Sequence, residues 1–80
     1  MSNNEQKEKL EFLQAQLEWT IKQYQLLDLI DEKLHEMKEI AELALDETLT
    51  KHDLLLLNEQ LQDLQREVVN LERILQTQIH

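Results

Sequence analysis

The sequence predicts an all-α protein, a long antiparallel helical hairpin of the coiled-coil type. Three observations support this fold class. The 80 residues include no Gly and no Pro, so the residues that most often break helices are absent. Apolar residues recur in steps of three and four along most of the chain, which places them on one face of a helix. A single short stretch, residues 46–50, interrupts this spacing.

The first helix is expected over about residues 7–46. Residues 1–6 are polar and unpatterned, and we expect them to be disordered because they offer nothing apolar to dock. A helix of about 40 residues is roughly 60 Å long, several times the globular average, which is typical of a bundle or coiled coil. Its apolar stripe consists of Leu10, Leu13, Leu17, Ile21, Tyr24, Leu27, Ile30, Leu34, Met37, Ala41 and Ala44.

This stripe widens at Leu26, Leu27, Leu29 and Ile30, which cover nearly half of the helix circumference. A helix that contacts two neighbours has such a wide apolar face. A helix with one broad core face in a globular bundle has it too. Trp19 is also open to two interpretations, an anchor of a binding interface or a partly buried core residue.

The interruption at residues 46–50 predicts a turn that contains Thr48. Thr50 and Asp53 have the spacing of a capping box, with Asp in place of the usual Glu, and this marks the start of a second helix. We expect that helix over about residues 51–79. Because no Gly or Pro marks the break, one unbroken rod of nearly the whole chain is the alternative.

The second helix carries an apolar series with the alternating spacing of a coiled-coil heptad. Its members are Leu54, Leu57, Leu61, Leu64, Val68, Leu71 and Leu75. If the chain folds back at Thr48, its C-terminus extends only to about Leu17. The first fifteen or so residues then project beyond the second helix.

Two helices in contact along one line leave part of each apolar stripe uncovered, and such surfaces mark interaction sites. We therefore expect the hairpin to complete a four-helix bundle, as a homodimer or with helices of a partner. The residues expected at this interface are Leu27, Ile30, Leu34, Met37, Leu57, Leu61, Leu64, Val68 and Leu71.

The formal net charge of −9 argues against nucleic acids and anionic lipid surfaces as partners. The longest apolar run, residues 54–57, is far too short to cross a membrane, and residues 1–10 contain no apolar signal segment. We expect no membrane partner and a cytoplasmic location. The lack of Cys agrees with a reducing compartment.

Glu32 and His35 have the spacing of the Glu-x-x-His ligand pair of di-iron bundles, and Glu36 and Glu39 are close by. Apolar side chains already occupy the inward face here, so we interpret these residues as a solvated charged face. No Ser or Cys nucleophile pairs with a His, and no Gly-rich loop is present to bind phosphate. We therefore expect no catalytic, cofactor or metal residues and no enzymatic activity.

Residues 26–71 also follow a longer order that runs without a gap through the predicted turn. The positions that carry it are Leu27, Ile30, Leu34, Met37, Lys38, Glu39, Ile40, Ala41, Ala44, Thr48, Thr50, Asp53, Leu57, Asn58, Leu61, Leu64, Glu67 and Val68. This order resembles the N-terminal helical hairpin of the filament core in bacterial flagellins and hook-filament junction proteins. The resemblance includes the Asn/Asp-x-Thr-x-Thr turn of that family and covers about half of the chain.

The resemblance implies a non-enzymatic protein that packs against helices of flagellin type, in flagellar assembly or as a mimic of the filament core. The chain lacks the family's characteristic start and the C-terminal helix that completes its core bundle, so we expect something other than an ordinary filament subunit. Glu36 occupies the position of a basic residue that flagellins use in packing and in immune recognition, and that role is not carried over. Export by a flagellar route is the alternative to a cytoplasmic location.

Two other functions are open to a helical hairpin of this size. Small helical-hairpin phosphatases of sporulation phosphorelays have a Ser-Gln-x-x-Leu-Asp type motif on their second helix. The corresponding stretch here, residues 58–62 (NEQLQ), has neither the Ser nor the Asp. The other alternative is a generic coiled-coil adaptor whose likeness to flagellins is a convergent heptad pattern.

Overall fold

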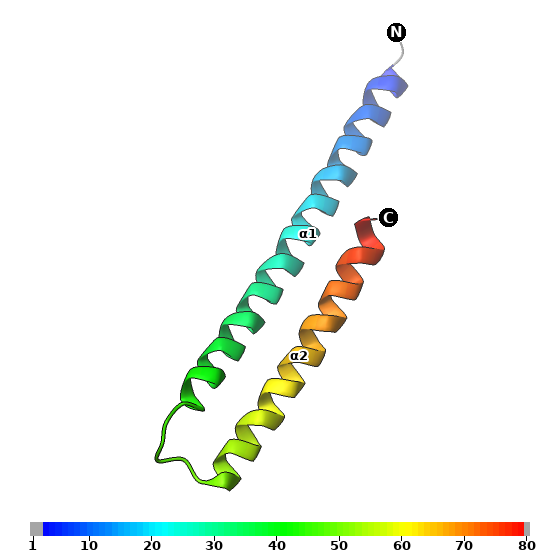
Figure 1. Ribbon diagram of the computed structural model, residues 1–80. Helices are drawn as coiled ribbons and strands as arrows, with labels where there is room; N and C mark the ends of the chain where they lie inside the picture. The colour runs from blue at the N-terminus through cyan, green and yellow to red at the C-terminus, as the bar shows by residue number, and fades with distance from the viewer. Residues whose placement is uncertain (1–2, 80) are drawn as a thin grey trace.

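The computed structural model describes residues 3–79, which form an antiparallel hairpin of two helices (Figure 1). Helix α1 spans Asn3–Leu43 and helix α2 spans Lys51–Ile79. The molecule is a rod with extents of 74 × 17 × 12 Å. The predicted all-α hairpin is therefore confirmed, and the alternative of one unbroken rod is wrong.

The ends of α1 differ from the sequence-based expectation. Residues 3–6, which we expected to be disordered, form the first turn of α1, while residues 1 and 2 lie outside the described residues. Nothing in this polar start breaks a helix, so the helix continues outward from its apolar part. At its other end α1 stops at Leu43, because the backbone hydrogen bonds there join residues three apart instead of four. The N–H groups of Leu45 and Asp46 donate to the carbonyls of Glu42 and Leu43, each at 3.1 Å.

Residues 44–50 reverse the chain with local side-chain hydrogen bonds. The Oδ1 atom of Asp46 accepts hydrogen bonds from the backbone N–H of Thr48 at 2.9 Å and from its hydroxyl at 2.8 Å. These two bonds, the backbone one first, lower the pKa of the Asp46 carboxyl. None of the described residues has a positive φ, so the reversal requires no Gly.

A capping box begins α2. The N–H of Thr50 donates to Oδ2 of Asp53 at 3.0 Å, and the N–H of Asp53 donates to the Thr50 hydroxyl at 3.1 Å. The two residues thereby satisfy backbone donors that a helix start leaves unpaired. Just before this box, the half-buried Leu49 lines a shallow hollow together with Leu43 and Leu57. The turn thus has a small apolar base.

The two helices pack along one seam on each. On α1 this inner seam consists of Trp19, Gln23, Leu26, Ile30, Lys33, Met37 and Ile40, of which all but Trp19 are buried or partly buried. On α2 the corresponding seam consists of Leu57, Leu61, Leu64, Val68, Leu71 and Leu75, all buried or partly buried. Both series alternate steps of three and four, which is the coiled-coil spacing.

The face of α1 that α2 covers differs from the stripe that the sequence suggested. Of that stripe only Ile30 and Met37 lie in the inner seam, and every other member is exposed. The difference arises because the inner seam includes two polar residues, Gln23 and Lys33. A search for regularly spaced apolar residues does not detect a seam that contains them. Lys33 is accommodated because its Nζ lies 3.2 Å from Oε2 of Glu67 on α2, and this contact also raises the pKa of Lys33.

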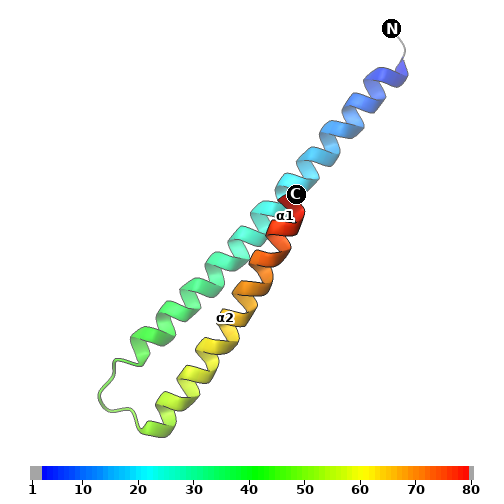
Figure 2. The same ribbon diagram turned by 45° about the vertical axis from the view of Figure 1, so that its right-hand side comes forward.

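Helix α2 is shorter than α1 and ends beside Trp19. The indole Nε1 of Trp19 donates to the carbonyl oxygen of Gln78 at 3.1 Å, close to the predicted end point at Leu17. Residues 3–18 of α1 therefore project past the end of α2, and we call them the overhang. Figures 1 and 2 show the overhang from two directions, with no second helix beside it in either view.

Replacement of Leu61 and Leu64 with Asp is expected to unfold the hairpin, because both side chains lie in the α2 seam. Placing two carboxylates against apolar neighbours costs roughly 4 kcal/mol or more, a large part of the stability of a domain this small. Circular dichroism should show loss of most of the helical signal. Leu55→Asp, at a side chain that is 56% exposed, is the matched control and should stay helical. A helical double variant would contradict the observed seam.

The capping box predicts that the stability of the hairpin depends on pH, because the Asp53 carboxyl is hydrogen-bonded to Thr50. The backbone N–H of Thr50, and then its side chain, lower the pKa of Asp53 below its ordinary value of 3.8. The stabilisation is therefore complete above pH 3.8 and is lost as the pH falls through the lower pKa of the folded protein. Thr50→Ala should cost about 1 kcal/mol of unfolding free energy and raise the Asp53 pKa only part of the way toward 3.8, because the backbone N–H of residue 50 remains. Carboxyl titration by NMR measures the pKa, with Thr77→Ala, a hydroxyl remote from the turn, as control.

Candidate interaction surface

An apolar stripe on α1 remains uncovered beside the inner seam. This outer stripe consists of Leu10, Leu13, Leu17, Tyr24, Leu27 and Leu34, and their exposed fractions range from 46% to 65%. The steps between its positions are three, four or seven, so the six side chains lie on one face of the helix. Its first three members belong to the overhang, and its last three lie where α2 runs alongside.

Helix α1 therefore presents two apolar stripes. Within the wide part noted in the sequence, Leu26 and Ile30 lie in the inner seam, whereas Leu27 is 46% exposed and Leu29 is 39% exposed. Leu27 and Leu29 are two residues apart and therefore lie on opposite sides of the inner seam, so only Leu27 belongs to the outer stripe. Helix α2 thus leaves part of the wide apolar face of α1 uncovered.

An apolar hollow lies on the outer stripe where α2 ends. It is lined by Trp19, Thr20, Gln23, Tyr24, Leu27 and Leu75. In this hollow the Gln23 amide donates from Nε2 to Oε1 of Gln78 at 2.5 Å, while its own Oε1 is buried without a partner among the described residues. The side chain of Trp19 is 42% exposed, so this residue both ties α2 to α1 and contributes to the open surface.

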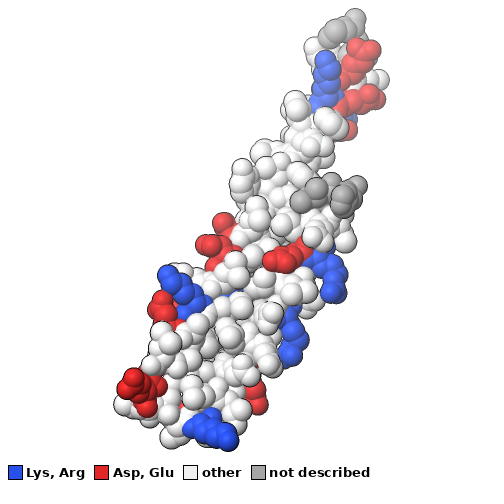
Figure 3. Space-filling model, in the orientation of Figure 1, with Lys and Arg blue, Asp and Glu red and all other residues white. Residues whose placement is uncertain are grey.

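Charged side chains are unevenly distributed over the molecular surface. On the face seen in Figure 3 they gather at the N-terminal tip and along the lower half of the hairpin, and a broad zone without charged residues lies between them. Exposed apolar surface is a common component of protein interaction sites, and the outer stripe supplies it here.

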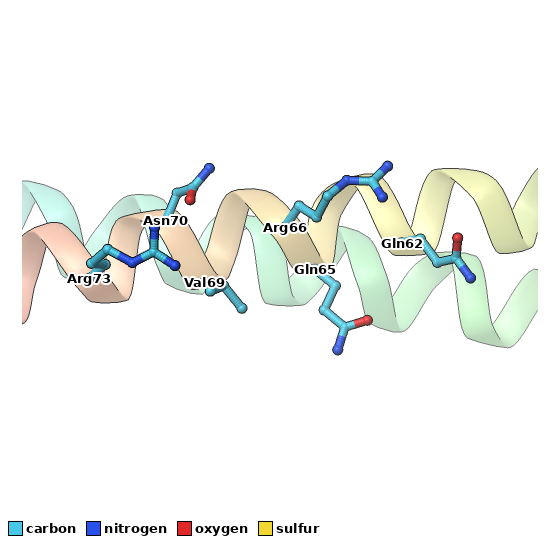
Figure 4. Close-up of a pocket in the computed structure, with 6 residues that line it drawn as sticks. All are labelled: Gln62, Gln65, Arg66, Val69, Asn70 and Arg73. Atoms are coloured by element: carbon cyan, nitrogen blue, oxygen red, sulfur yellow. The ribbon is translucent and has the colours of Figure 1, made fainter.

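The outer face of α2 is polar by contrast. A shallow hollow there is lined by Gln62, Gln65, Arg66, Val69, Asn70 and Arg73. Figure 4 shows these side chains spread along α2 without converging on a common point. Arg66 pairs with the carboxylate of Asp63 on the preceding turn. This face therefore has neither the apolar area of a helix-packing surface nor the convergent groups of a ligand site.

Most of the nine residues predicted for the interface lie between the two helices. Ile30 and Met37 belong to the inner seam of α1, and Leu57, Leu61, Leu64, Val68 and Leu71 belong to the seam of α2. The face that we expected to receive a helix of another molecule is thus occupied by the chain's own second helix. Leu27 and Leu34 lie instead on the outer stripe, with exposed fractions of 46% and 47%.

Of the residues considered for chemistry, Glu32, His35 and Glu39 are exposed, and Glu36 is partly buried. Nε2 of His35 is 3.7 Å from Oε1 of Glu39, and both side chains are more than 60% exposed. Within residues 3–79 no group of three or more His, Asp or Glu side chains is placed to hold a metal ion. In residues 58–62 of α2, Leu61 belongs to the seam and the other four residues are exposed.

Neither helix, over the part of the chain that the structure describes, combines the length and the apolar character needed to cross a lipid bilayer.

The hairpin has an unusually large surface for its mass. A compact monomer of 9.6 kDa exposes about 5,100 Å², whereas this chain exposes 6942 Å². Among the described residues only Gln23, Ile30 and Val68 are classed as buried, and no large side chain is fully enclosed. The chain thus has a thin core and surplus surface, and the outer stripe is one apolar part of that surface.

Comparison of the chain with protein-family models, with curated proteins and with solved structures finds no match.

Replacement of Gln23 with Leu is expected to stabilise the hairpin. The buried Oε1 of Gln23 lacks a partner among the described residues, so an apolar side chain of similar size removes a desolvation cost of about 1 kcal/mol or more. Thermal unfolding followed by circular dichroism should show a higher midpoint for Gln23→Leu. Gln25→Leu, at an exposed position on the same helix, is the control and should leave the midpoint nearly unchanged. A lower midpoint for Gln23→Leu would contradict this account of the seam.

Proposed function

We propose that this chain is a non-enzymatic protein that acts by packing the outer stripe of α1 against helices of another molecule. The observation that carries the proposal is the uncovered second stripe, six large apolar side chains at exposed fractions of 46% to 65%. A surface of this kind is stable in water only at a cost that a partner helix removes. The partner is a second copy of the chain or a helical protein of flagellin type.

The surface area supports a stable association. The chain exposes 6942 Å², about 1,800 Å² more than a compact monomer of its mass. A standard protein interface covers about 800 Å² on each partner, so the surplus suffices for such an interface. Part of the surplus follows from the elongated shape, and the apolar character of the outer stripe identifies which part is available for packing.

The sequence order through the reversal supports a partner of flagellin type. The positions that carry the resemblance span the end of α1, residues 44–50 and the first half of α2, and the chain reverses direction at that point. In this proposal the protein works in the cytoplasm, in flagellar assembly or as a mimic of the filament core. Export by a flagellar route is the alternative location.

The competing functions have less support. A phosphatase role would use residues 58–62, which lack the Ser and the Asp of the phosphatase motif. A generic coiled-coil adaptor would use the same outer stripe and differs only in the identity of the partner. An assay with an aspartyl-phosphorylated response regulator distinguishes the first alternative, since turnover by the chain would overturn the non-enzymatic proposal.

Direct binding to purified monomeric flagellin tests the proposal. We expect saturable binding that Leu27→Glu/Leu34→Glu weakens at least tenfold, because two charges would enter an apolar contact. Isothermal titration calorimetry measures the affinity, and analytical ultracentrifugation of the chain alone measures self-association. Leu55→Glu, on α2 and 56% exposed, is the matched control and should bind as the wild type does.

Two results would count against the proposal. A wild-type chain that stays monomeric and does not bind flagellin would leave the outer stripe without a helical partner. Equal effects of Leu27→Glu/Leu34→Glu and of Leu55→Glu would show that the outer stripe is not the binding surface. Circular dichroism of each variant confirms that the hairpin itself is intact.

A further inference from the structure

The outer stripe has two parts, one on the overhang and one on residues 20–34 of α1. The overhang carries Leu10, Leu13 and Leu17 but has no helix beside it (Figure 2). Residues 20–34 of the same helix carry Tyr24, Leu27 and Leu34, and here α2 covers only the inner seam. The overhang is thus a helix segment with no helix packed against its apolar residues. Residues 20–34 have an exposed apolar face, against which the hairpin itself packs no third helix.

We propose that the overhang of one copy docks antiparallel on residues 20–34 of α1 in a second copy, while the second copy's overhang docks in the same way on the first. The arrangement is a two-fold symmetric dimer in which the same patch serves both subunits. It rests on the proposed function, because it names a second copy of the chain as the molecule that packs on the outer stripe.

The apolar residues match in this orientation. An alignment that places Leu10 opposite Leu27 of the other copy also places Leu13 opposite Tyr24 and Leu17 opposite Thr20. By symmetry each of these contacts occurs twice. The hollow lined by Trp19, Tyr24, Leu27 and Leu75 lies under the docked helix, so the contact covers this apolar part of the surface.

The charges of the overhang favour this docking. Its only basic residues, Lys7 and Lys9, border the outer stripe on either side, three and four residues before Leu10 and Leu13. Glu8 lies on the opposite face of α1, whereas Glu11 comes four residues after Lys7 and Glu5 four residues before Lys9. The lysines are therefore the charged residues nearest the apolar strip of the overhang, and the carboxylates lie farther from it.

The receiving surface has negative margins. Asp28 lies three heptads after Lys7, and hence on the same side of the outer stripe. On the other side lies α2, where the pairing of Lys33 with Glu67 places Glu72 level with Asp28. In the antiparallel alignment Lys7 comes beside Asp28 and Lys9 beside Glu72 of the other copy. A parallel alignment would instead place Lys7 beside Lys9 and Asp28 beside Glu72 of the other copy, which brings like charges together.

The lengths of the two helices also agree with this dimer. Each α2 ends beside Trp19, and the alignment places residue 18 of one copy next to residue 19 of the other. The described parts of the two α2 helices therefore end near each other without overlapping along the helix axis. Three helices lie side by side along the contact, whereas a four-helix bundle would need a second apolar face on α2, which carries Gln62, Gln65 and Arg66 instead.

Disulfide crosslinking between two different variants tests the proposal. The natural sequence has no Cys, so Leu10→Cys and Leu27→Cys each introduce a single thiol. Under mild oxidation a mixture of the two variants should form a disulfide-linked species of twice the 9.6 kDa chain mass, made of one chain of each variant. A sample of Leu10→Cys alone or of Leu27→Cys alone should form no disulfide-linked dimer, because residues with the same number lie far apart in an antiparallel pair. The control mixture, Leu10→Cys with Leu55→Cys, should not crosslink, since residue 55 lies near the turn.

Reversal of the margin charges provides a second, independent test. Lys7→Glu/Lys9→Glu should raise the dimer dissociation constant roughly tenfold at low salt, because each unfavourable pair occurs twice in the symmetric dimer. Adding Asp28→Lys/Glu72→Lys to the same chain should restore the wild-type constant. Sedimentation equilibrium measures both, and the restoration separates an effect on docking from an effect on helix stability.

Three outcomes would overturn the proposal. Crosslinking of Leu10→Cys alone would indicate a parallel pair. A wild-type chain that remains monomeric at 100 µM, roughly the concentration at which weak dimers form, would show that no second copy docks. A failure of charge restoration would show that the margins do not face each other. In each case flagellin binding that depends on Leu27 and Leu34 would leave the proposed function standing, because that assay does not require a dimer.

Discussion

The packing of the α2 leucine series against the inner seam of α1 is the contact on which the rest of the hairpin depends. Two helices touch along one line only, so each buries a single stripe. Residues classed as buried lie on that line, Ile30 and Gln23 on α1 and Val68 on α2. Everything else, including the overhang, the hollow at the end of α2 and the outer stripe, is what this one line of contact leaves uncovered.

Polar residues within the seam fix how the two helices align. Apolar side chains alone permit several alignments, because a shift by one heptad brings leucines against leucines again. Lys33 must meet Glu67, and the amide of Gln23 must meet Gln78, so the alignment that satisfies both is selected. Trp19 adds a third tie at the end of α2 through the Gln78 carbonyl. These contacts occupy seam positions at which apolar side chains would bury more apolar surface, and they define the position of α2 along α1.

The asymmetry between the helices concentrates the available surface on α1. Helix α1 has 41 residues and two apolar stripes, while α2 has 29 residues and one. The faces of α2 away from α1 carry residues such as Gln62, Arg66 and Arg73, which stay hydrated. A partner helix therefore gains apolar contact mainly from α1. Because the overhang continues the same helix, the outer stripe runs from the overhang into the part of α1 that lies beside α2.

The sequence by itself determined the features that are local. The absence of Gly and Pro and the apolar period gave an all-α hairpin, the series through Leu57, Leu61 and Leu64 gave the α2 seam, and the spacing of Thr50 and Asp53 gave the capping box. Only the tertiary structure decided which face of α1 is covered. Leu26 and Leu27 are identical in hydrophobicity, and the choice between their faces depends on contacts of Gln23 and Lys33 with residues more than thirty positions away, which a local period does not contain.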